Sequence, residues 1–150
     1  MSVALLDVNV LLALLWPQHA SHPVASRWFA DNRAQGWATC LITEAGFVRI
    51  STQPAVMGTG VSVRGAIQLL EANCADPGHV FWPLEHPVGE LLPEIRSRLV
   101  GRQQLNDGIL LDLAIRRNGR LVTLDRRVGN LLPSASTHLA AVEVLEAPTP

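Results

Sequence analysis

The sequence predicts an α/β fold in which helices cover both faces of one central parallel sheet of about five strands. Short apolar runs alternate along the chain with segments of helical periodicity, and this alternation is typical of a parallel sheet. Neither a long linker nor an internal repeat interrupts it, and 150 residues suit one domain. We therefore expect a single domain over residues 1–146, followed by a frayed tail at 147–150.

Residues that start or stop secondary structure bound the expected elements. The apolar run 3–6 predicts a buried strand, and the apolar stretch 10–15 directly after it predicts a helix. Ser21 and Pro23 favour the start of a second helix. The remaining elements are strands at 37–42, 79–82, 120–125 and 138–146, helices at 43–50 (capped by Thr43), 62–73, 108–118 (capped by Asn106) and 126–132, a short helix ending near Val100, and a loop at 54–60.

Four acidic residues occupy equivalent places in this pattern. Asp7 and Asp125 each end a strand, and Glu44 and Asp107 each lie in the first turn of a helix. Because the carboxyl ends of parallel strands meet at one edge of the sheet, we expect these side chains to converge. Each acid also has an ordinary interpretation, since acids are favoured as helix caps and near helix N-termini.

Four unpaired carboxylates close together would repel one another and raise one another's pKa values. A divalent cation removes this conflict, and an oxygen-only ligand set without cysteine favours Mg²⁺ or Mn²⁺ over zinc. Such a centre suits phosphodiester hydrolysis, because it orients the phosphate and activates a bound water. The net charge is −1, but without the four acids twelve arginines face only nine acids, which is compatible with a polyanionic substrate.

The absence of lysine removes several classes of enzyme. All twelve basic residues are arginine, so neither a GxxxxGK[ST] phosphate-binding loop nor a Schiff-base mechanism is available. Receiver domains and haloacid-dehalogenase-type phosphatases, which use an aspartate at the same strand end, normally need a lysine beside it. The Gly58-Thr59-Gly60 run lacks the third glycine of a dinucleotide-binding fingerprint, and we interpret it as a flexible connection.

The acids and their neighbours resemble those of a PIN-domain ribonuclease, and more narrowly a VapC-type toxin of a type II toxin–antitoxin system. The resemblance covers nearly the whole chain in order. It is carried by the segments Leu5-Leu6-Asp7-Val8-Asn9-Val10-Leu11-Leu12-Ala13-Leu14, Trp37-Ala38-Thr39-Cys40, Thr43-Glu44-x-Gly46-Phe47, Asn106-Asp107 and Leu121-Val122-Thr123-Leu124-Asp125-Arg126. Relatives often have threonine where this chain has Asn106, which caps a helix equally well.

This resemblance implies a PIN-like three-layer α/β/α fold and cleavage of RNA with Mg²⁺ or Mn²⁺. It implies that Asp7, Glu44, Asp107 and Asp125 are the metal-binding and catalytic acids, with Asn9 as a supporting polar neighbour. We expect Asp7 and Asp107 to be primary ligands, and Asp125 or Glu44 to hold or deprotonate the attacking water. The resemblance further implies a cytoplasmic bacterial homodimer, inhibited by a VapB-type antitoxin whose tail covers the acidic cleft.

Several other residues have competing interpretations. Asp112 lies about 140° around its helix from Asp107, so we expect a structural or surface role. Arginines 96, 98 and 102 form either a solvated face or a phosphate contact. Of the four tryptophans we assign 28, 37 and 82 to the core, whereas Trp16 could stack on bases.

The cysteines and histidines are expected to be unremarkable. Cys40 and Cys74 are interpreted as reduced thiols rather than a disulfide. The i, i+3 pair His19 and His22 is expected in an exposed loop rather than as zinc ligands, and the histidines at 79 and 86 are likewise expected to be ordinary. No apolar run approaches the ~18 residues of a membrane helix, and no basic stretch marks a secretory signal.

The rival interpretation is a non-catalytic α/β module that binds RNA or protein, with its acids serving only as helix caps. It predicts that acid-to-amide changes cost only the stability of a cap and that Mn²⁺ does not bind. A phosphatase of another fold ranks third.

Overall fold

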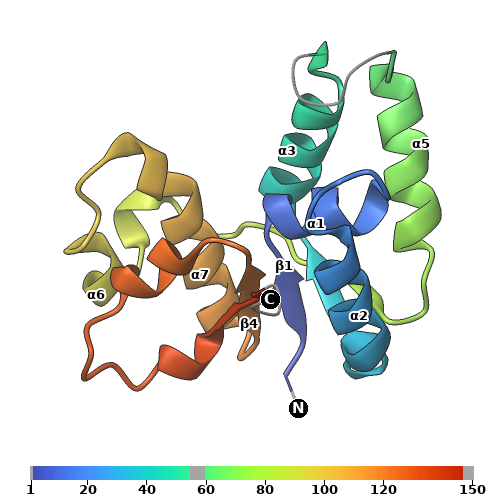
Figure 1. Ribbon diagram of the computed structural model, residues 1–150. Helices are drawn as coiled ribbons and strands as arrows, with labels where there is room; N and C mark the ends of the chain where they lie inside the picture. The colour runs from blue at the N-terminus through green and yellow to red at the C-terminus, as the bar shows by residue number, and fades with distance from the viewer. Residues whose placement is uncertain (1, 55–59, 147–150) are drawn as a thin grey trace.

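The computed structural model describes residues 2–54 and 60–146 and is built around one sheet (Figure 1). The five strands run in the order β3-β2-β1-β4-β5, and each pairs in parallel with its neighbours. The expected parallel sheet is confirmed, with β1 at its centre. The strands are β1 (Ala4–Leu6), β2 (Trp37–Thr39), β3 (His79–Phe81), β4 (Arg120–Thr123) and β5 (Val142–Val144).

The helices connect consecutive strands and lie on both faces of this sheet. Figure 1 shows α1, α2, α3 and α5 on one side of β1 and β4, and α6 and α7 on the other. The helices are α1 (Val8–Leu15), α2 (His22–Asn32), α3 (Leu41–Ser51), α5 (Val63–Cys74), α6 (Pro93–Arg96) and α7 (Leu105–Arg116). Short 3₁₀ turns are η1 (Arg33–Gln35), η2 (Val88–Glu90), η3 (Arg102–Gln104), η4 (Arg126–Leu131) and η5 (Leu139–Ala141).

Two hydrophobic cores, one on each face of the sheet, hold the three layers together. Successive strand residues point to opposite faces, so Leu5 and Leu121 enter the core beneath α7, and Leu6 and Val122 enter the core beneath α1 and α3. All four side chains are fully buried. Tryptophans 28, 37 and 82 are also buried, as expected. This packing fixes the ends of β1 and β4, where the acids lie.

Two expected helix starts were wrong, because α3 and α7 both begin earlier than the hydrophobic pattern suggests. The strand at 37–42 ends at Thr39 because Cys40 already caps α3. Thr43 is not the cap but the third helical residue, and its hydroxyl accepts from the Cys40 backbone N–H at 3.0 Å. Similarly α7 begins at Leu105, directly after a 3₁₀ turn, so Asn106 lies inside the helix rather than capping it.

The least regular segments are shorter than the sequence suggested. The short helix expected to end near Val100 ends at Arg96, and helix 126–132 is a 3₁₀ turn. The last strand is confined to β5, preceded by a 3₁₀ turn. Most of the loop at 54–60 and the tail at 147–150 fall outside the described residues. Among the described helices, none combines the length and the apolar character that crossing a membrane requires.

Candidate active site

Asp7 lies directly after the central strand, and it is almost completely buried, with 6% of its surface exposed. Its Oδ1 accepts from the backbone N–H of Val8 at 2.8 Å, so it does cap α1. Its Oδ2 accepts from the hydroxyl of Thr123 at 2.7 Å. Burial nevertheless raises the pKa of Asp7, and the charge of Asp125 raises it further. A cap alone would not need a buried carboxylate next to a second one.

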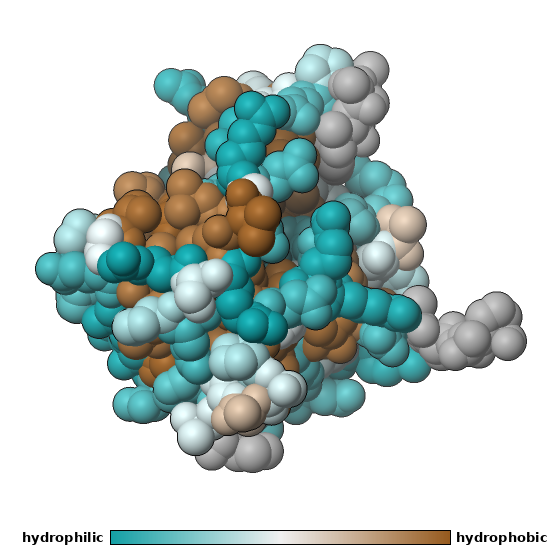
Figure 2. All heavy atoms as spheres, turned by 90° about the vertical axis from the view of Figure 1, so that its left-hand side faces the viewer, coloured by the Kyte–Doolittle hydropathy of each residue, from teal (hydrophilic) through white to brown (hydrophobic). Residues whose placement is uncertain are grey.

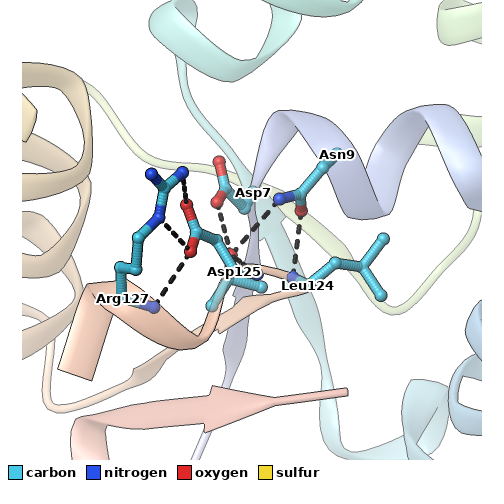
Figure 3. A network of polar contacts seen from close by, with 6 residues as sticks. Asp7, Asn9, Leu124, Asp125 and Arg127 are labelled. Atoms are coloured by element: carbon cyan, nitrogen blue, oxygen red, sulfur yellow. Dashed lines mark hydrogen bonds and ion pairs between the residues drawn. The ribbon is translucent and has the colours of Figure 1, made fainter. Parts of the chain in front are cut away.

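A polar network joins the end of β1 to the end of β4, as Figure 3 shows for Asp7, Asn9 and Asp125. The Thr123 oxygen accepts from the backbone N–H of Asp125 at 3.1 Å and from Asn9 Nδ2 at 3.4 Å. Asn9 Oδ1 in turn accepts from the backbone N–H of Leu124 at 3.2 Å. The hydroxyl therefore donates its one proton to Asp7 and accepts from the Asp125 backbone and from Asn9 of α1. These contacts fix the orientation of the Asp7 carboxylate.

Asp107 lies within range of the charges of both other aspartates. Burial, together with the charges of Asp7 and Asp125, raises the pKa of Asp107 to about 6. Asp125 caps η4 and accepts from Arg127 through the backbone N–H at 2.9 Å, through Nε at 3.0 Å and through Nη2 at 2.9 Å. These contacts lower the pKa of Asp125 and keep it ionised. The structure thus brings three of the four expected acids together.

A cavity of about 360 Å³ opens beside these acids. Asp107 and Asp125 line it together with Arg102 and Arg127. The cavity therefore combines carboxylates, which suit a cation, with guanidinium groups, which suit phosphate.

The three arginines expected to cluster, at positions 96, 98 and 102, have different surroundings. Arg96 donates to the Gly89 carbonyl at 2.7 Å, and Arg98 donates to the Asn130 carbonyl at 3.0 Å. Only Arg102 of this cluster lines the cavity.

Glu44 lies elsewhere among the described residues, so the expectation that it joins the other acids is not met. Its Oε2 accepts from Thr39 at 2.6 Å, and its charge acts on Cys74 and His79, whereas the pKa values of Asp7 and Asp107 respond to the other aspartates. The cause is the phase of α3. Gly46 faces α1 beside Asp7, and Glu44, two residues earlier, points about 200° away.

Comparison with known proteins identifies the fold family. The model of the PIN domain family matches residues 4–131. The chain belongs to the PIN-domain family. Among VapC proteins of this family, it is 44% identical over 142 residues to Ribonuclease VapC39 of Mycobacterium tuberculosis (strain CDC 1551 / Oshkosh), which covers 95% of this chain and 99% of the relative. It is 45% identical over 129 residues to Ribonuclease VapC38 of Mycobacterium tuberculosis (strain ATCC 25618 / H37Rv), covering 86% and 89%.

A solved structure agrees with this PIN-domain fold. The crystal structure of VapBC2 from Rickettsia felis bound to a DNA fragment from their promoter contains a chain with a TM-score of 0.62 and 15% identity, covering 96% of this chain and 99% of that one. At this identity the likeness concerns the fold, and it confirms the three-layer α/β/α arrangement.

The PIN-domain site includes one residue that sequence reasoning missed. Thr123 looked like an ordinary strand residue, because threonine favours strands and its neighbours are apolar. The available signal was its position two residues before Asp125, which puts both side chains on the same face of the strand.

The contacts of Asp112 and Trp16, both outside the site, decide between their competing interpretations. Asp112 is buried, accepts from the Leu92 backbone N–H at 2.8 Å and pairs with Arg116 at 2.8 Å, so its role is structural and the surface alternative was wrong. The Trp16 indole donates to Ser51 at 2.9 Å and stacks on a phenylalanine of α3, so it is part of the core rather than a free platform for bases.

The histidines follow expectation only in part. His19 is partly buried and accepts from the backbone N–H of Ser21. His22 is the first residue of α2, is also partly buried and contacts the Ala13 carbonyl, so the expected exposed loop was wrong and both residues serve local structure. Both cysteines are free. His79, expected to be ordinary, instead lies beside Glu44 and Cys74.

Proposed function

We propose that this PIN-domain chain is the toxin of a toxin–antitoxin pair and acts as an endoribonuclease that depends on Mg²⁺ or Mn²⁺. The observation that carries the proposal is the group of three aspartates, Asp7, Asp107 and Asp125, whose like charges act on one another at the carboxyl edge of the sheet. The names of the ribonuclease relatives support RNA as the substrate. The two free thiols are consistent with a reducing bacterial cytoplasm.

The donor set fits a hard divalent cation. All three side chains offer only oxygen. Burial and neighbouring negative charge raise the pKa values of Asp7 and Asp107, so a bound cation would stabilise their ionised carboxylates. Asp7 and Asp107 would hold the ion, with Asp125 completing the set. When bound, such an ion lowers the pKa of a water and offsets the charge of the scissile phosphate.

The chain's own residues would orient the reactants. Thr123 and the Val8 N–H hold Asp7 in one orientation, so its free lone pairs point consistently towards the site. Asp125, kept ionised by Arg127, would accept a hydrogen bond from the attacking water. Arg102, which lines the same cavity, would contact a phosphate of the RNA backbone.

Apolar surfaces support the proposal that the chain binds further proteins. An apolar cavity of about 660 Å³ lies between α3 and α5, where Leu41 and Val63 are 65% and 57% exposed. Figure 2 shows hydrophobic side chains gathered in one continuous area on the face that it presents. Large exposed apolar areas are typical of interaction sites. We assign them to a second copy of this chain and to a VapB-type antitoxin.

Replacement of Asp7 by asparagine tests the catalytic proposal. Asp7→Asn preserves shape and can still accept the Thr123 hydrogen bond, but it removes the charge that would bind the cation. RNA cleavage in Mg²⁺ or Mn²⁺ should fall by at least 100-fold, while the circular dichroism spectrum stays unchanged. Asp31→Asn, at an exposed position on α2, should cleave like wild type.

A calorimetric titration with Mn²⁺ separates the nuclease from the non-catalytic module. Wild type should release or absorb binding heat that Asp7→Asn lacks. If Asp7→Asn cleaves RNA as fast as wild type, or if wild type binds no Mn²⁺, the proposal is wrong.

A further inference from the structure

A second group of potential metal ligands lies outside the acidic site. Glu44 is in the first turn of α3, Cys74 is the last residue of α5 and His79 is the first residue of β3. One ligand atom from each of these side chains lies within 4.8 Å of the other two. Among the described residues this is the one such group of three, and all three side chains are partly buried.

A buried threonine lies at the base of this group. The Thr39 hydroxyl donates to Glu44 Oε2 at 2.6 Å and lies 2.7 Å from His79 Nε2. Thr39 therefore contacts two of the three side chains and holds them beside each other.

Packing fixes the orientation of the His79 ring. The ring lies against Trp37, with the two ring centroids 4.6 Å apart. Thr39 at the base of the group is fully buried.

A cation could reach the group from solvent. Glu44 and Cys74 both line the cavity between α3 and α5, so the group is accessible from this cavity. An entry path of this kind is one requirement for a metal site.

We propose that Glu44, Cys74 and His79 form a Zn²⁺ site that is separate from the acidic site and independent of the proposed ribonuclease activity. A set of one thiolate, one imidazole and one carboxylate suits zinc, whereas Mg²⁺ requires oxygen ligands. In tetrahedral zinc coordination the ligand atoms lie about 3.4–3.6 Å apart, as follows from the usual bond lengths. The side chains need to close by at most about 1.4 Å from separations within 4.8 Å, and water would occupy the fourth position.

A bound zinc ion would connect three elements that are otherwise joined mainly by apolar contacts. It would tie the end of α5 to the start of α3 and to β3, the edge strand of the sheet. Binding to the folded chain alone stabilises it by mass action, so the midpoint of thermal unfolding should rise with zinc.

Cobalt spectroscopy tests this site directly. Metal-free protein titrated with Co²⁺ should develop a thiolate-to-cobalt charge-transfer band in the near ultraviolet at one equivalent, and Zn²⁺ should displace it. Cys74→Ser should abolish the band, and His79→Gln should weaken Zn²⁺ binding by about 100-fold or more, measured by competition with a chromophoric chelator.

Two variants serve as matched controls. Cys40→Ser replaces the other cysteine, which lies outside the group, and should keep the cobalt band. Asp7→Asn should also keep it, even though that variant loses the proposed cation site of the nuclease. The inference is overturned if the wild-type protein gives no thiolate band, or if Cys74→Ser retains it. Circular dichroism of each variant confirms that a lost band does not reflect unfolding.

Discussion

Replacing Asp107 by asparagine should make the folded protein more stable at neutral pH while it abolishes the proposed activity. The free energy of the wild-type fold includes the cost of an ionised Asp107 in a half-buried position beside two other acids. Its pKa rises from 3.8 to about 6 on folding. Asparagine has nearly the same shape and carries no charge, so the cost disappears.

The pKa shift sets the magnitude and the pH range. A shift of two units corresponds to at most about 3 kcal/mol at about 1.4 kcal/mol per unit. Because Asp107 is partly exposed to solvent, we reduce this to about 1–1.5 kcal/mol. A raised pKa favours the protonated native state, so wild type loses stability as the pH rises from about 4 to about 6. Asp107→Asn lacks this loss, and its advantage should vanish below pH 4.

Urea unfolding at pH 7 and pH 4, with a chelator present, measures this difference. Asp112→Asn is the matched control, because Asp112 lies on the same helix but pairs with Arg116 and the Leu92 backbone N–H. That variant loses a buried charge-assisted hydrogen bond and should be less stable by about 1.5–3 kcal/mol. If Asp107→Asn is destabilised like the control, or if its advantage does not change with pH, the electrostatic account is wrong.

Two further changes probe how the site is held. Thr123→Val removes the hydrogen bond to the buried Asp7 carboxylate, so the free energy of unfolding in urea should fall by about 1.5–3 kcal/mol. NMR titration should also show a higher pKa for Asp7. An unchanged pKa would contradict the proposed network. Gly46→Ala adds a Cβ 2.7 Å from the Val8 side chain, so α1 and α3 must separate. The free energy of unfolding should fall by about 1–3 kcal/mol in the same assay. A variant as stable as wild type would show that this contact is not tight.

The sheet could be predicted from the sequence because its signal is local. Leu5, Leu6, Leu121 and Val122 lie in short apolar runs, and parallel strands buried on both faces need only such runs. The position of Asp7 after the first run followed directly. Helix boundaries were less accessible, because the Cys40 cap and the Thr43 hydroxyl act through backbone geometry that the hydrophobic pattern does not reveal.

The acidic site was only partly predictable for the same reason. Asp7 and Asp125 extend strands, so their position depends on the sheet alone. Glu44 depends on the rotational phase of α3, and moving the helix start by three residues changes which face it occupies. Its contacts with Cys74 and His79 come from segments 30 and more residues away, at a spacing that matches no common metal-binding motif.

The pairing of the central strand has a consequence for when the protein can act. Asp7 and Thr123 are 116 residues apart in sequence, and β1 can pair with β4 only after β4 has been synthesised. A nascent chain that has emerged only as far as Gly119 contains Asp7 but neither Thr123 nor Asp125. Assembly of the acids therefore waits until Asp125 has left the ribosome, and shorter nascent chains carry no complete centre.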